Sequence, residues 1–146
     1  MLSRLVFNAK DVVGFSLNGA EDSWESRLLV DKEGMGSNSL VVNHFTLKPG
    51  KVTGDAFSHA EPFDEVYYVL TGTGVVSLGD PAEQFDLSPG VVVFIPGGTL
   101  HRVVNTGAED LELLTVMPGP LPEGINPVYD ERRRAWGKTY RLVSES

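Results

Sequence analysis

The chain has 146 residues, a formal net charge of −8, 41% hydrophobic and 22% charged residues, and no cysteine. This length corresponds to one domain with its own core, and the negative charge argues against a surface for nucleic acid or anionic lipid. The lack of cysteine excludes disulfides and thiolate zinc sites. Any metal must therefore be held by histidine, aspartate, glutamate or tyrosine.

The sequence gives no sign of a targeting or membrane segment. Lys10 and Asp11 fall where a signal peptide would need its apolar stretch. No apolar run approaches the roughly 20 residues that span a membrane. We therefore expect a cytoplasmic protein with neither a nucleic-acid nor a membrane partner.

Short apolar or β-rich runs recur along the chain, with glycine and proline in the breaks between them. The runs cover residues 12–16, 27–30, 40–47, 66–70, 75–78, 84–87, 91–95, 102–104 and 111–117. Many short strands separated by turn residues predict an all-β sandwich or barrel. Helical spacing is confined to a turn or two at residues 130–136, and no repeat, linker or second domain is indicated.

The last part of the chain, residues 118–146, is expected to be a short helical or irregular tail. It carries a local excess of positive charge around Arg132, Arg133 and Arg134. One interpretation is a solvated tail that packs along the barrel through Tyr129 and Trp136. The other is a positive rim beside a pocket, or a segment exchanged with a partner subunit.

The stretch from residue 57 to residue 69 places several polar side chains at every second position. His59, Glu61, Glu65 and Tyr67 share one parity, so on an extended backbone they face the same way if the turn near Pro62 preserves the register. Two carboxylates inside a closed barrel are costly unless they are paired or bound to a cation. A metal ion is the simplest partner for this group.

A second stretch supplies another histidine after a tight turn. It reads Gly90, five residues, Pro96, one, Gly98, two, His101, three, Asn105. This spacing matches the second cupin motif at every position. The first stretch resembles the first cupin motif, in which a histidine, one residue, a second histidine, three or four residues, a glutamate, six residues and a glycine follow one another.

In the first motif His59, Glu65 and Gly72 fit the pattern. The resemblance covers about residues 50–117 and implies a small single-domain cupin, with a double-stranded β-helix or jelly-roll barrel spanning residues 1–146. Two departures stand out. The glycine before the motif is displaced, and Glu61 replaces the second histidine. Cupins usually bind metal through three histidines and one glutamate, whereas this chain offers His59, Glu61, Glu65 and His101.

The extra carboxylate changes the charge of the expected site. Two imidazoles and one carboxylate leave a divalent ion at +1, and a second carboxylate brings it to zero, which makes the centre a weaker Lewis acid. Oxygen ligands favour Mn(II) or Fe(II), with Ni(II) and Zn(II) also admitted. Three roles remain open for Glu61: a fourth ligand, a general base or a group that supports the ligands of a two-histidine, one-carboxylate centre, or the mark of a degenerate site.

Two further residues have two readings each. Tyr67 shares the parity of Glu65 and either offers its hydroxyl to a substrate or packs in the core. His44 lies outside both motifs, and either belongs to a sheet face or dimer contact or lines the pocket. Asn105 and Gly98 are expected to be turn and register residues.

The resemblance implies one divalent metal (Mn, Fe, Ni or Zn) and a small-molecule partner. The expected function is a metal-dependent enzyme acting on a hydroxy, keto or sugar acid by isomerase, lyase or cyclase chemistry, or by dioxygenase chemistry if iron is bound. Glu61 or Tyr67 would then be the nearest proton-transfer group. The alternative is a non-catalytic cupin that binds a metal or small ligand. Cupins commonly pair through sheet edges, so a homodimer is expected. Residues 24–36 also resemble the stretch before the barrel in ectoine synthase, itself a cupin.

Overall fold

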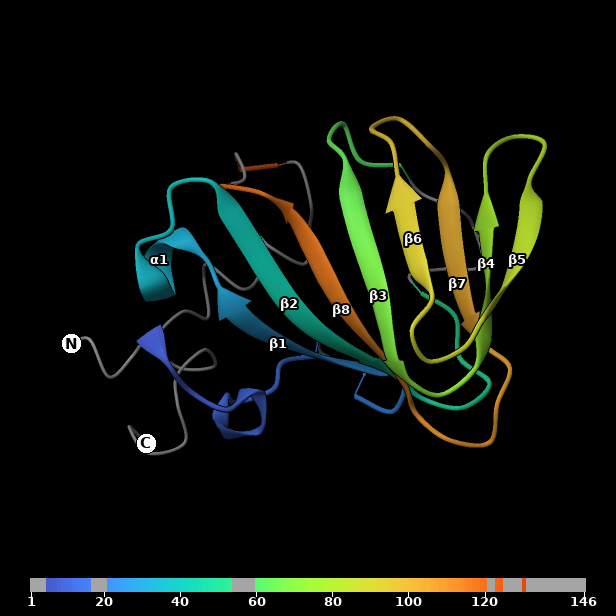
Figure 1. Ribbon diagram of the computed structural model, residues 1–146, viewed down its shortest axis with the longest axis horizontal. Helices are drawn as coiled ribbons and strands as arrows, with labels where there is room; N and C mark the ends of the chain where they lie inside the picture. Colours follow the sequence, from blue (N-terminus) through green and yellow to red (C-terminus); the bar gives the residue numbers. More distant parts are fainter. Residues whose placement is uncertain (1–4, 17–20, 54–59, 121–122, 125–129, 131–146) are drawn as a thin grey trace.

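The computed structural model describes residues 5–16, 21–53, 60–120, 123–124 and 130. Within them the chain forms two antiparallel sheets, seen side by side in Figure 1. The larger sheet has the strand order β1-β2-β8-β3-β6 and the smaller one the order β5-β4-β7. The strands are β1 (Trp24–Val30), β2 (Leu40–Leu47), β3 (Glu65–Thr71), β4 (Gly74–Leu78), β5 (Glu83–Leu87), β6 (Val92–Ile95), β7 (His101–Asn105) and β8 (Leu111–Pro118).

The sequence order of the strands differs from their order in the sheets. β8 lies between β2 and β3, and β7 pairs with β4. Neighbours along the chain are therefore often placed in different sheets, as in a jelly roll. The all-β, jelly-roll fold expected from the sequence is confirmed.

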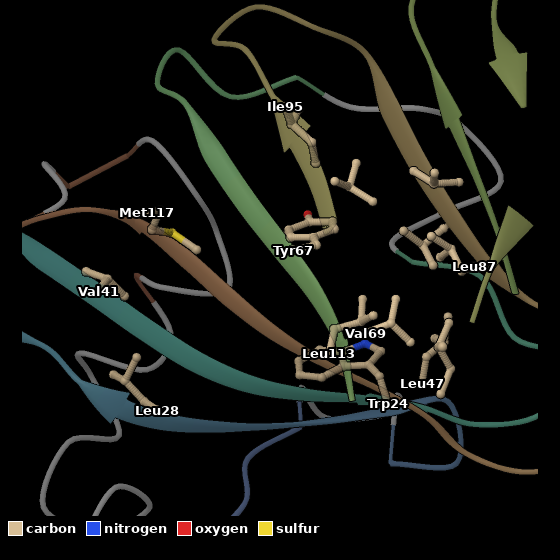
Figure 2. Close-up of a cluster of buried hydrophobic side chains, with 14 of the residues drawn as sticks. Trp24, Leu28, Val41, Leu47, Tyr67, Val69, Leu87, Ile95, Leu113 and Met117 are labelled. Carbon is tan, nitrogen blue, oxygen red and sulfur yellow. The ribbon is translucent and has the colours of Figure 1, made fainter. Parts of the chain in front are cut away.

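Alternation along the strands defines one inner face for each sheet. In β8 and β7 every second side chain is buried, beginning with Leu111 and His101. The hydrophobic core draws on both sheets, with Val69, Leu113 and Ile95 from the larger and Val76 and Val103 from the smaller. Figure 2 shows part of this cluster gathered between the strands. Because the two sheets share one core, inward side chains of one sheet meet those of the other.

The strand runs expected from the sequence agree with the observed strands, apart from the first. Residues 12–16 form no strand: Val12 and Phe15 are single bridge positions, and Phe15 bridges to Ser26. The short helix α1 (Lys32–Met35) was not anticipated. Its N-cap is Asp31, whose Oδ1 accepts a hydrogen bond from the backbone N–H of Gly34 at 2.7 Å. Gly36 ends it in the left-handed conformation with φ 71°.

Two expectations concern the ends of the chain. The helical turn at residues 130–136 and the basic tail lie almost wholly outside the described residues, so both stay predictions, as does a single domain over residues 1–146. In the described part of the chain, no helix has the length and apolar character needed to cross a membrane.

Candidate metal centre

Strand β3 carries two of the predicted site residues on the inner face of the larger sheet. Glu65 is 5% exposed and Tyr67 is also buried. Tyr68, which follows Tyr67 and points the opposite way, is exposed. Glu65 lies opposite Ile95 and Tyr67 opposite Val93 on β6. Alternation in a half-buried strand thus turns the glutamate and the tyrosine into the interior, as their shared parity predicts.

His101 enters the same interior from the smaller sheet. It begins β7 and is 1% exposed. Its ring meets the ring of Tyr67 edge to face, with centroids 6.0 Å apart and planes at 76°. This contact brings the two cupin motifs together, because β3 carries the first motif and β7 the second.

Glu61 is placed by the loop before β3. It is 8% exposed, and its carbonyl accepts a hydrogen bond of 2.7 Å from the backbone N–H of Gly98. The preceding residue of the same turn, Gly97, donates its N–H to Oδ1 of Asp64 at 2.8 Å. A side chain at Gly97 would collide with the backbone of Pro62. The glycines of the second motif therefore let its turn dock closely on the loop of the first.

The two carboxylates influence each other. Burial, and then repulsion by the charge of Glu61, raise the pKa of Glu65 from 4.5 to about 7, although a side-chain hydrogen bond with Tyr67 acts in the opposite direction. Like charges in a poorly hydrated interior disfavour ionisation of both groups. A cation bound between them would remove this penalty.

The His101 imidazole is oriented by the backbone. Its Nδ1 lies 3.0 Å from the carbonyl oxygen of Thr99. Since a carbonyl only accepts, Nδ1 carries the proton, and in the neutral ring the lone pair then lies on Nε2. Burial lowers the pKa of His101, so the neutral ring is favoured. A metal-binding histidine typically has this arrangement, with the second nitrogen donating to a carbonyl.

The donor set present fits a divalent metal of intermediate hardness. Glu61, Glu65 and His101 are all buried, and they supply carboxylate oxygens and one imidazole nitrogen. His59, the fourth predicted ligand, lies outside the described residues. Among the described residues, no group of three or more histidine, aspartate or glutamate side chains is placed to hold a metal ion.

The other residues discussed from the sequence have clear positions. His44 faces away from the interior, with Nε2 3.1 Å from Oε1 of Glu112, which supports its structural reading. Asn105 is fully buried and donates from Nδ2 to the carbonyls of Leu47 and Glu109, both at 2.8 Å. It holds the turn after β7 against the end of β2, as expected of a register residue.

Sequence reasoning missed a set of buried polar side chains on the inner face of the larger sheet. Asn43 and Thr115 are opposite one another on β2 and β8, and Thr115 is opposite Tyr67 on β3. Ser26 of β1 donates to Oδ1 of Asn43 at 2.5 Å. A signal was available: within the apolar run 40–47, Asn43 shares the inward parity of Val41 and Leu47.

The fold and the paired motifs define a β-barrel of the cupin class, and the comparisons agree. The model of the cupin domain family matches residues 43–117. The chain is 32% identical to the oxalate-binding protein of Thermotoga maritima over 70% of its own length and 81% of that protein. The chain belongs to the cupin family.

Two further similarities extend beyond the motif region. L-ectoine synthase of Bordetella petrii is 30% identical over 80% of this chain and 84% of that protein. A crystal structure described as a predicted oxalate decarboxylase from Thermotoga maritima has a TM-score of 0.65 and 27% identity, covering 77% of this chain and 97% of that one. These relatives differ in their named activities, so they support an enzyme-like cupin without selecting a reaction.

Proposed function

We propose that the protein is a metal-dependent cupin enzyme that acts on a small, oxygen-rich organic acid inside the barrel. One observation carries the proposal: the buried carboxylates of Glu61 and Glu65 repel each other, and Tyr67, which hydrogen-bonds Glu65, contacts the oriented imidazole of His101. Such a pair of carboxylates is stable at neutral pH only if a cation or a proton accompanies it.

The metal ligands in this proposal are His59, Glu61, Glu65 and His101. A bound divalent ion would polarise the oxygens of a hydroxy, keto or sugar acid. Thr99 fixes the ring of His101 with Nε2 as its acceptor atom. Tyr67 lies between Glu65 and the His101 ring, where its hydroxyl is a candidate for proton transfer at the substrate.

Two roles for Glu61 fit its position equally well. As a fourth ligand it neutralises the centre, and as a general base it moves a proton on the substrate. A degenerate, metal-free site is less compatible with the acidic pair, because evolution of a metal-free core would favour replacing buried carboxylates that repel each other.

The test is elemental analysis of purified protein after reconstitution with Mn(II), Fe(II), Ni(II) and Zn(II), taken singly. We expect about one ion per chain in the wild type and a loss of metal in His101→Ala. Retention of full metal by Glu61→Ala would exclude Glu61 as an essential ligand and favour its role as a base, and loss of metal would assign it as a ligand. A wild-type protein that takes up none of the four metals would overturn the proposal.

Within this proposal, chemistry without a redox step is favoured: isomerisation, elimination or cyclisation. The similarity to a relative named L-ectoine synthase supports an enzyme. Dioxygenase chemistry becomes the alternative if the reconstituted metal is iron. Analysis of the metal retained during purification separates these two cases.

A binding protein without turnover is the second candidate. The similarity that favours it is to a relative named oxalate-binding protein. If the protein is an enzyme, Tyr67→Phe should leave ligand affinity nearly unchanged and lower turnover. If it is a binding protein, the wild type should convert no bound acid.

The homodimer expected from the sequence is retained as a prediction. β6 forms one edge of the larger sheet, and its outward side chains Val92 and Phe94 are 59% and 56% exposed. Tyr68 and Leu70 on β3 extend this apolar area. An exposed apolar area on an edge strand is typical of a contact with another chain. A cytoplasmic location also stays a prediction.

A further inference from the structure

The inner face of the larger sheet carries polar side chains that the proposed metal centre does not use. Asn43 and Thr115 are only 4% and 6% exposed. They lie in one row with Tyr67, since Tyr67 is opposite Thr115 and Thr115 is opposite Asn43. We call Tyr67, Thr115, Asn43 and the adjoining Ser26 the polar row.

The polar row begins at the proposed metal centre and leads away from it. Tyr67 contacts the His101 ring, and the next two members sit on β8 and β2. Neighbouring strands are about 4.8 Å apart, so Asn43 lies about 10 Å across the sheet from Tyr67. A two-carbon acid is too short to cover this distance. An acid of about six carbons can cover it when protein side chains hold both of its ends.

Two members of the polar row have hydrogen-bonding capacity to spare. Asn43 uses Oδ1 to accept from Ser26, and no hydrogen bond between described residues uses its Nδ2. Thr115 donates to the carbonyl of Asn43 over a long 3.4 Å. The Nδ2 of Asn43 is not among the sealed side-chain atoms of the described residues that lack a partner, so it faces an accessible space inside the fold. A polar group that enters this space can accept from Asn43 and can bond the weakly held hydroxyl of Thr115.

The charge of that occupant follows from what is absent around the row. No lysine or arginine in the described part of the chain is buried, and the row itself is neutral. A second carboxylate would be buried without a cation there, which is costly. Hydroxyl groups both donate and accept, and they match the amide and hydroxyls of the row without adding charge.

Resting on the proposed metal site, we infer that Asn43 and Thr115 of the polar row bind the hydroxylated chain of a sugar acid of about six carbons, whose carboxylate end lies at the metal centre. Asn43 and Thr115 are then the residues that determine specificity. This substrate class differs both from two-carbon acids such as oxalate and from longer acids that carry a carboxylate at each end.

The test compares four acids that share one α-hydroxy carboxylate end: glycolate, 2-hydroxyhexanoate, 2-hydroxyadipate and gluconate. The last three have six carbons and differ only beyond C2, being apolar, charged at the far end or hydroxylated. Affinities are measured by calorimetry on Mn(II)-loaded protein whose metal content has been determined beforehand. We expect gluconate to bind at least about tenfold more tightly than each of the others, since several neutral hydrogen bonds are gained.

Three variants locate the effect. Asn43→Asp keeps an acceptor for Ser26 but replaces the donor with a negative charge, and it is expected to abolish the preference for gluconate. Thr115→Val preserves shape and is expected to weaken gluconate alone, by about three- to tenfold. Thr46→Val is the matched control, because Thr46 is equally buried, on the same strand as Asn43 but of opposite parity. It should change no affinity.

The outcomes separate this inference from the proposed function. Normal metal content with no preference for gluconate, or with an unchanged preference in Asn43→Asp and Thr115→Val, overturns the sugar-acid assignment and leaves the metal centre standing. Absence of metal, seen before any acid is added, overturns both. Thermal unfolding of each variant verifies that it is folded. If Asn43→Asp does not fold, Thr115→Val alone tests the inference.

Discussion

Tyr67 and His101 meet edge to face across the interior, 6.0 Å between ring centroids, and each comes from a different sheet. Through this contact the residue that hydrogen-bonds Glu65 also touches the imidazole expected to bind metal. The hydroxyl and the ring of Tyr67 therefore have separable tasks, and a substitution that removes only one of them is informative.

Tyr67→Phe keeps the ring contact and removes the hydroxyl. Because the hydrogen bond with Tyr67 lowers the pKa of Glu65, this variant is expected to raise that pKa further above 7. Carbon-13 NMR of labelled glutamate carboxyls in metal-free protein measures the change. Tyr68→Phe, on the outer face of the same strand, is the control. An unchanged Glu65 titration would contradict the coupling between the two side chains.

The stability of the metal-free protein is expected to fall as the pH rises toward neutrality. The folded-state pKa of Glu65 is about 7 against 4.5 for the free side chain. The contribution of Glu65 is therefore fully present below pH 4.5 and is lost as the pH rises through 7. Its upper limit is about 3 kcal/mol. Urea unfolding of chelator-treated protein between pH 4.5 and 8 measures the change.

His101 acts in the opposite direction and must be separated from Glu65. Its pKa is lowered in the fold, so its contribution is present above pH 6.5 and is lost as the pH falls below that value. Glu65→Gln removes the carboxylate and should flatten the decline in stability toward pH 7. A decline of equal size in Glu65→Gln would assign the pH dependence to other groups.

Gly97→Ala is expected to loosen the docking of the second motif on the first. The new methyl group would collide with the backbone of Pro62, which cannot move without disturbing Glu61 next to it. We expect a loss of about 1–3 kcal/mol in unfolding free energy together with weaker metal uptake. Denaturant unfolding and metal titration measure the two effects.

The companion change at this contact is Asp64→Ala, which removes only the acceptor for the Gly97 N–H. Asp64→Asn retains an acceptor and is the control. If Gly97→Ala bound metal as well as the wild type, the loop of the first motif would not depend on this turn for its position.

Phe94→Ser together with Val92→Ser is expected to convert a homodimer into a monomer, because both side chains lie exposed on the edge strand β6. Sedimentation velocity measures the change in mass. Phe85→Ser, exposed on β5 of the other sheet, is the control. A monomeric wild type at the concentrations used would refute the expected dimer.

Much of the fold followed from the sequence. The strand runs were recognisable because they are short and largely apolar, and because glycine and proline are frequent in the breaks between them. The motif spacing singles out Glu65 and His101, and both are buried in the fold. The parity of residues 65 and 67 predicts the inward direction that both side chains take. Helix α1 was missed because a single turn capped by Asp31 has no hydrophobic period to reveal it.

Tertiary structure decided what the spacing could not. Strand order puts β8 between β2 and β3, and only this order aligns Asn43 and Thr115 with Tyr67 on one face. The elevated pKa of Glu65 likewise depends on burial and on the charge of Glu61. Local periodicity determines which way a side chain points along its own strand. The neighbours it meets are set by long-range strand pairing, which the sequence of a single strand does not encode.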